Sequence, residues 1–110
     1  MKPLSKAEEA MLLAIWRLKD NAYGVTIREQ VHSVSQQRYT YGTLYGLLDQ
    51  LVRKEHLFRI KGEPTNERGG RSKMFYELTL TGIEALKRAQ IEHQSVWEGI
   101  SEFNLDSEQK

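Results

Sequence analysis

Hydrophobic residues recur at three- and four-residue spacing in four stretches of the chain, which is typical of amphipathic helices. Residues that suit helix N-termini precede three of these stretches. Ser5, with Glu8 three residues later, has the pattern of a capping box, and Thr40 is an expected N-cap. Either Thr79 or Thr81 is expected to cap the last helix. The spacing predicts helices over residues 5–19, 25–35, 41–55 and 81–104.

The spacing changes to alternation between the third and fourth expected helices, which predicts two β-strands. Phe58 and Ile60 alternate with charged residues in the first strand, and Met74 and Tyr76 begin an alternating pattern in the second. Residues 62–73 between them are rich in glycine and charge. We therefore expect an antiparallel hairpin with a long tip.

Three helices, a two-stranded hairpin and a final helix form the layout of a winged helix-turn-helix. We predict a mainly α-helical fold with a small β-hairpin, and the length of 110 residues suits one hydrophobic core. In this layout the third helix enters the DNA major groove and the hairpin, or wing, contacts the backbone or the minor groove. Residues 1–80 are the expected DNA-binding domain, residues 81–104 a C-terminal dimerisation helix and residues 105–110 a frayed tail.

Charge is unevenly distributed along a chain whose formal net charge is only +1. Residues 38–73 contain eight basic and four acidic side chains, whereas residues 74–110 contain three basic and seven acidic ones. A basic middle segment suits a polyanion such as double-stranded DNA, and an acidic end suits solvent or a protein partner. Chance clustering is the alternative interpretation.

Small, hydroxyl-bearing and cationic residues gather in the two elements that would meet DNA. Gly42 and Gly46 each cost the third helix about 1 kcal/mol relative to alanine, so close approach of another surface would explain them. Hydroxyls suit phosphates and base edges, and wing cations suit phosphates. Alternatively, Tyr41 and Tyr45 pack on the hairpin and the loop is merely a solvated charged segment. The candidate DNA contacts are Thr40, Tyr41, Gly42, Thr43, Tyr45, Arg68, Gly70, Arg71 and Lys73.

The last helix carries an apolar stripe that one small domain is not expected to bury alone. A second copy of the chain would cover it, which predicts a homodimer. Packing of the stripe on the first helix is the alternative. Trp16, in the first helix, is expected in the core. The candidate dimer-interface residues are Leu86, Ala89, His93, Val96, Trp97, Ile100 and Phe103.

The composition argues against catalysis, metal binding and membrane insertion. The chain has no cysteine, so disulfides and thiolate metal sites are excluded, and a reducing, cytoplasmic location is expected. His32, His56 and His93 fall on different expected elements, and no serine nucleophile motif accompanies them. No apolar stretch is long enough to span a bilayer, and no signal peptide is recognised. We expect no enzyme activity, no cofactor and no metal.

Three segments of the chain resemble the PadR family of transcriptional regulators, in its short form with a single C-terminal helix. The resemblance extends over about residues 8–103, and the segments occur in the family's order. The matching segments are Tyr23-Gly24 with Ile27, Gly42-Thr43-Leu44-Tyr45 with Leu48 and Leu51, and Gly69-Gly70-Arg71 through Phe75-Tyr76-Glu77-Leu78-Thr79 with Gly82.

The resemblance implies a homodimer that binds a pseudo-palindromic operator and commonly represses until a small molecule releases it. Positions that match the family's DNA contacts are Thr43, Tyr45, Gly70, Arg71 and Lys73. It also implies that Trp97 stacks on a flat aromatic or hydrophobic effector, although Trp97 also suits an interface anchor. His93, one turn before Trp97, is the second candidate effector residue. It would resist protonation in an apolar seam and suits either a switch or simple packing.

Two positions depart from the family pattern. The family usually has glycine where His56 stands, and histidine tolerates the left-handed conformation expected there. Proline commonly follows the tyrosine of the third helix, whereas Gly46 stands here. The alternative to a DNA-binding regulator is a winged-helix module that docks on another protein without sequence-specific DNA binding.

Overall fold

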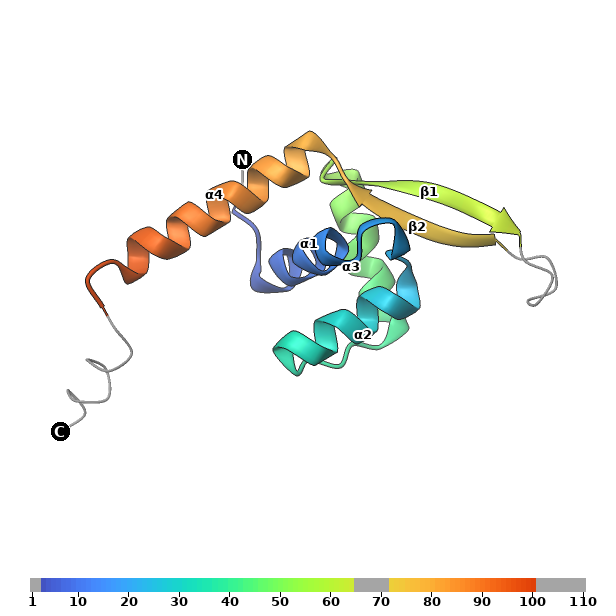
Figure 1. The fold of residues 1–110 in the computed structure, drawn as a ribbon, viewed down its shortest axis with the longest axis horizontal. Helices are drawn as coiled ribbons and strands as arrows, with labels where there is room; N and C mark the ends of the chain where they lie inside the picture. The colour runs from blue at the N-terminus through green and yellow to red at the C-terminus, as the bar shows by residue number, and fades with distance from the viewer. Residues whose placement is uncertain (1–2, 65–71, 101–110) are drawn as a thin grey trace.

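The computed structural model describes residues 3–64 and 72–100, and its fold is mainly helical with one hairpin, as predicted (Figure 1). Helices α1, α2 and α3 form the body of the molecule, and the hairpin and α4 extend from it on opposite sides. The elements in chain order are α1 (Lys6–Leu18), a 3₁₀ turn (Lys19–Asn21), α2 (Gly24–Ser35), α3 (Tyr41–Arg53), β1 (Leu57–Pro64), β2 (Ser72–Leu78) and α4 (Leu80–Trp97).

The hydrophobic core lies where the three helices of the body meet the base of the hairpin. Complete burial of each large apolar side chain contributes roughly 1.5–3 kcal/mol, which is how this small body offsets the entropy of ordering its chain. The core residues are Met11, Leu12, Ala14 and Ile15 of α1, Ile27 and Val31 of α2, Leu44, Leu48 and Leu51 of α3, and Ala22, Leu57 and Tyr76.

Side-chain caps start three of the helices, and two of them follow the sequence prediction directly. The Ser5 hydroxyl accepts from the Glu8 amide at 3.1 Å while the Glu8 carboxylate accepts from the Ser5 amide at 2.9 Å, which confirms the capping box. Thr40 caps α3 by accepting from the backbone of that helix. Of the two candidates for α4, Thr79 is the N-cap, because its hydroxyl accepts from the Gly82 amide at 3.0 Å.

The hairpin is antiparallel, with Leu57 opposite Leu78 at its base and Lys61 opposite Met74 further out. Strand β1 continues to Pro64, and β2 begins at Ser72 and ends at Leu78, earlier than the alternation predicted. The connection is therefore shorter than expected, residues 65–71, and these lie outside the described residues. The Tyr76 amide donates to the Ala22 carbonyl at 2.9 Å, which attaches β2 to the segment before α2.

The end of α3 differs from the prediction in where the left-handed residue lies. Glu55 has a φ of 65°, whereas His56 follows it in the buried interior. The His56 amide donates to the Leu51 carbonyl and the Glu55 amide to the Val52 carbonyl, both at 2.9 Å, which is a Schellman motif. This motif puts the left-handed conformation one residue earlier than expected, because the helix itself ends at Arg53 rather than near Glu55.

Helix α4 begins on the body and then leaves it (Figure 1). Gly82 and Ala85 are buried and Leu86 packs against the core, whereas residues 90–100 are exposed. The prediction that the helix continues to residue 104 is wrong, because Glu98 leaves the helical conformation and Gly99 takes a φ of 80°. The predicted tail at 105–110 lies outside the described residues.

Candidate nucleic-acid interface

The outer face of α3 presents two glycines one turn apart. Leu44, Leu48 and Leu51 face the core, and at 100° per residue Gly42 and Gly46 lie on the opposite side. A Cβ at Gly42 would approach only the Thr40 hydroxyl, at 4.0 Å, and one at Gly46 would have nothing within 4 Å. Because no contact in the described structure requires glycine there, the α3 backbone is open to close approach by a second molecule.

Hydroxyl groups lie at the N-terminus of α3. The Thr40 hydroxyl accepts from the Thr43 amide at 3.2 Å and lies 3.1 Å from the Thr43 hydroxyl. Both threonines are exposed. Thr40 therefore acts first as the cap, and the exposed Thr43 hydroxyl lies at the positive end of the helix dipole, where anionic groups are favoured.

Two tyrosines of α3 pack on each other and on α2. The rings of Tyr41 and Tyr45 stack with their centroids 6.3 Å apart, and each residue is 41% exposed. The Tyr45 hydroxyl lies over Gly24, at the start of α2, in the space that a Cβ would occupy. The structure thus brings Tyr41, Tyr45 and the start of α2 onto one surface.

Two cations lie over tyrosine rings beside α3. The Arg28 guanidinium lies 4.7 Å from the ring centroid of Tyr41, and the Lys73 ammonium lies 4.3 Å from that of Tyr23. Lys73 is among the contacts predicted from the sequence, whereas Arg28 is not, because its positive charge was the only signal it offered. The other predicted wing contacts, Arg68, Gly70 and Arg71, lie outside the described residues.

One carboxylate on α3 is neutralised by the wing. Asp49 accepts from the Arg59 guanidinium at 2.5 Å, and both side chains are partly exposed. The hydrogen bond to Asp49, with a smaller contribution from Tyr76, raises the pKa of Arg59 above its usual range. An unpaired carboxylate here would repel phosphates, and the ion pair reduces that repulsion.

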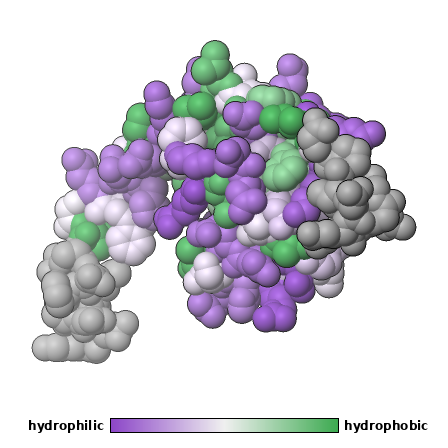
Figure 2. Space-filling model, turned by 45° about the vertical axis from the view of Figure 1, so that its right-hand side comes forward, coloured by the Kyte–Doolittle hydropathy of each residue, from purple (hydrophilic) through white to green (hydrophobic). Residues whose placement is uncertain are grey.

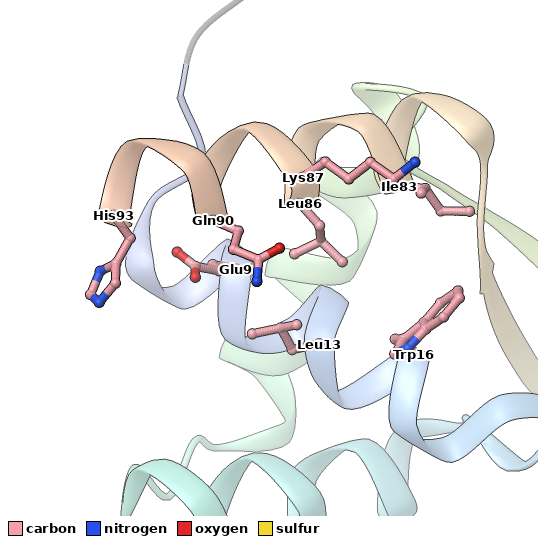
Figure 3. A pocket seen from close by; sticks show the side chains of 8 residues that line it. All are labelled: Glu9, Leu13, Trp16, Ile83, Leu86, Lys87, Gln90 and His93. Carbon is pink, nitrogen blue, oxygen red and sulfur yellow. The ribbon is translucent and has the colours of Figure 1, made fainter. Parts of the chain in front are cut away.

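A second candidate site lies between α1 and α4, as a groove of about 470 Å³ (Figure 3). Leu13 and Trp16 point into it from α1, and Leu86 and His93 line it from α4. The expectation that Trp16 belongs to the core is wrong: it is 50% exposed, because its position on α1 faces α4 rather than α2 and α3. The full lining is Glu9, Leu13, Trp16, Ile83, Leu86, Lys87, Gln90 and His93.

The predicted dimer stripe divides into two parts along α4. Leu86 packs against the core of its own chain, and Ala89 is half-buried. Val96, Trp97 and Ile100 are exposed, Val96 to 73%, and Figure 2 shows hydrophobic side chains among hydrophilic ones near the far end of this helix. The His93 and Trp97 rings lie 6.0 Å apart, so the structure brings the two predicted effector residues together. Phe103 lies outside the described residues.

Among the described residues, no three histidine, aspartate or glutamate side chains gather as a metal site would require. None of the described helices has the length and apolar character needed to cross a membrane.

Comparisons with known proteins agree with this geometry. The model of the "Transcriptional regulator PadR-like family" matches residues 12–88. A PadR family transcription regulator from Clostridium difficile R20291 superposes with a TM-score of 0.73 at 21% identity, over 90% of this chain and 98% of that one. A PadR-like regulator from Bacillus cereus gives 0.67 at 17% identity, over 94% and 92%.

Apo MarR from E. coli has a similar fold, with a TM-score of 0.61 at 21% identity over 94% of this chain and 72% of that one. A comparison with curated proteins finds no match. The structural likenesses confirm the winged-helix fold, and the family model extends from α1 well into α4. The chain therefore belongs to the PadR-like family, whose members are transcription regulators and not enzymes.

Proposed function

We propose that this regulator binds a pseudo-palindromic DNA operator as a homodimer and represses transcription until a small aromatic or hydrophobic effector releases it. Residues 1–80 would contact DNA and residues 81–104 would dimerise. The observation that carries the proposal is the open face of α3, where Gly42 and Gly46 leave the helix backbone accessible. A major groove about 12 Å wide admits an α-helix, and a backbone without side chains on its outer face approaches the base edges most closely.

The groups around this face suit the parts of a DNA duplex. Thr43 and Tyr45 would contact base edges, while Thr40, Tyr41 and the amides at the helix start would contact phosphates. Lys73 extends the basic surface along β2. On this proposal Arg68, Gly70 and Arg71 of the wing add contacts to the backbone or to the narrow minor groove.

The homodimer would form through α4. Val96, Trp97 and Ile100 expose apolar area that a folded monomer leaves in water, and exposed apolar patches mark interaction surfaces. Leu86, Ala89, His93 and Phe103 would continue the interface along the same helix. Two-fold symmetry would then put the two α3 helices into successive major grooves, about 34–36 Å apart.

The effector would bind in the groove between α1 and α4 that His93 lines, with Trp97 one turn further along α4. The groove there has a volume within the range of roughly 300–1,000 Å³ that is usual for small-molecule sites. Its lining joins aromatic and aliphatic side chains to a few polar ones, which suits a flat apolar molecule. Because the groove joins α4 to α1, a bound effector would change the angle of α4 and hence the spacing of the two α3 helices.

Selection of genomic DNA fragments with the purified chain tests this function. The enriched duplex and a scrambled duplex of equal length are then titrated by fluorescence anisotropy across a salt series, and sedimentation gives the stoichiometry. We expect an inverted repeat, bound by two protomers well above the scrambled control. In the same assay, Thr43→Ala should change sequence preference, whereas Arg71→Ala should weaken binding to both duplexes and flatten the salt slope.

Equal and weak binding to both duplexes would contradict the proposal. The exposed apolar half of α4 would then favour the second candidate, a winged-helix module that docks on another protein.

A further inference from the structure

Three tyrosines lie where the start of α2 meets α3 and β2. Tyr41 stacks on Tyr45, and the Tyr45 hydroxyl covers Gly24, which follows Tyr23 in the chain. The Tyr23 ring is in turn held by Phe75 of β2, in an edge-on contact with centroids 5.4 Å apart. We call Tyr23, Tyr41 and Tyr45 the tyrosine row.

A cation lies at each end of the tyrosine row. Arg28 covers Tyr41 at one end and Lys73 covers Tyr23 at the other. A cation over an aromatic face is attracted by the ring quadrupole, which holds the charge in place without using its N–H donors. The two positive groups are therefore ordered before any ligand arrives, so less entropy is lost when they bind one.

Arg28 is also fixed by a hydrogen bond. Its Nε donates to the Tyr39 carbonyl at 2.5 Å, just before the N-cap of α3. A guanidinium has five N–H donors, and this bond uses one of them. Within the described part of the chain, no carboxylate pairs with Arg28, and its terminal nitrogens donate to no protein acceptor.

We infer that Arg28 is a DNA-phosphate ligand that Tyr41 and Tyr39 hold in position, and that Arg28 and Lys73 bind phosphates on either side of α3. The inference rests on the proposed DNA-binding function and adds a site to it. It also gives Tyr41 a second role, because its ring supports Arg28. A planar guanidinium with free terminal donors matches two phosphate oxygens.

The test uses the full chain, the selected operator and the scrambled duplex, with anisotropy across a salt series. Arg28→Ala should weaken binding to both duplexes by a similar factor of about ten or more, because a hydrogen-bonded charge pair is lost. The slope of log affinity against log salt should fall by about one per protomer. Arg17→Ala removes an equal charge from the exposed surface of α1, outside the tyrosine row, and should leave most of the affinity.

Substitutions at Tyr41 separate its ring from its hydroxyl. Tyr41→Phe keeps the ring beneath Arg28 and should lose at most the phosphate contact of the hydroxyl, whereas Tyr41→Leu should lose clearly more affinity for both duplexes because Arg28 loses its support. Equal losses in the two variants would overturn the supporting role. Loss on the operator alone after Arg28→Ala, or an unchanged salt slope, would overturn the phosphate role and assign Arg28 to base contact or to folding.

Two further variants keep the inference testable if Arg28→Ala unfolds. Arg28→Gln keeps an N–H donor without the charge and should reproduce the smaller salt slope. Arg28→Lys keeps the charge and should restore the wild-type slope. Thermal melting verifies that each variant is folded. If the wild type binds the operator no better than the scrambled duplex, the proposed function fails. If the wild type prefers the operator and Arg28→Gln has the same affinity and salt slope as the wild type, only this inference fails.

Discussion

The hydroxyl of Tyr45 lies over Gly24, in the space that a Cβ on residue 24 would fill. Gly24 is the first residue of α2 and Tyr45 belongs to the second turn of α3, so this contact sets how closely the two helices approach. The absence of one methyl group therefore orients a side chain of the proposed DNA-binding surface.

Gly24→Ala should displace the Tyr45 ring rather than the backbone, because the crowded atoms are the far end of a rotatable side chain. We expect a loss of about 1 kcal/mol in the free energy of unfolding, together with weaker operator binding. Urea unfolding of Gly24→Ala, Tyr45→Leu and the double variant measures the coupling. The double variant should be no less stable than Tyr45→Leu alone, and additive losses would show that the two residues do not interact.

Gly42→Ala and Gly46→Ala should stabilise the fold and weaken DNA binding. Both positions have space for a Cβ, so alanine should raise the free energy of unfolding by roughly 0.5–1 kcal/mol each through helix propensity. The added methyl groups would hold the α3 backbone away from the base edges. Thermal melting and anisotropy on the selected operator test both effects, and unchanged operator affinity in both variants would contradict close approach at this face.

Gly82→Ala should have the opposite effect on stability. A Cβ there would meet the backbone carbonyl of His56, which accepts from the Thr79 amide at 3.1 Å and so has little freedom to move. We expect a loss of roughly 1–3 kcal/mol in urea unfolding and a displaced start of α4. Gly46→Ala is the matched control, since it makes the same chemical change in open space. Equal stability of the two variants would show that α4 does not pack tightly on His56.

Glu8 should make the fold sensitive to acid. This carboxylate is 2% exposed; burial would raise its pKa, but hydrogen bonds from Lys54, the Ser5 amide and Gln50 together lower it. A lowered pKa contributes stability that is present above the unfolded value of about 4.5 and is lost as pH falls through the folded value. Glu8→Gln should remove this dependence and cost about 1–3 kcal/mol near neutral pH, measured by urea unfolding from neutral to acidic pH. A wild type equally stable at both ends of that range would contradict the assignment.

His56 should make the stability of the fold depend on pH in a second range, above the one governed by Glu8. Its side chain is 4% exposed, and its Nδ1 has no hydrogen-bond partner in the described structure. Burial, followed by the charge of Lys54, lowers the pKa of His56 below 6.5 despite an opposite effect of Glu8. The stability that neutral His56 contributes is therefore full above pH 6.5 and is lost as pH falls from there through the folded value.

His56→Leu should remove the loss of stability below pH 6.5, because it replaces an unpartnered polar ring with an apolar side chain. Unfolding measured on both sides of pH 6.5 tests it. Identical profiles for the wild type and His56→Leu would show that His56 does not titrate with folding.

Local signals in the sequence predicted most element boundaries, because the groups responsible are neighbours in the chain. Ser5 and Glu8 lie three residues apart and define the start of α1 whatever packs on it. Thr40 acts on its own helix in the same way. The end of α4 was predicted less well, because the apolar stripe continues past Gly99 while the backbone turns there.

The order of helices and strands and the winged-helix fold follow from local sequence patterns, since periodicity and caps depend on neighbouring residues. The contacts between distant side chains depend on how the elements pack. Glu8 contacts Lys54 across 46 positions, Arg28 lies on Tyr41 across a turn, and Trp16 faces α4 instead of the core. Such pairings arise when packed elements bring separate faces together, and no spacing along a single element specifies them.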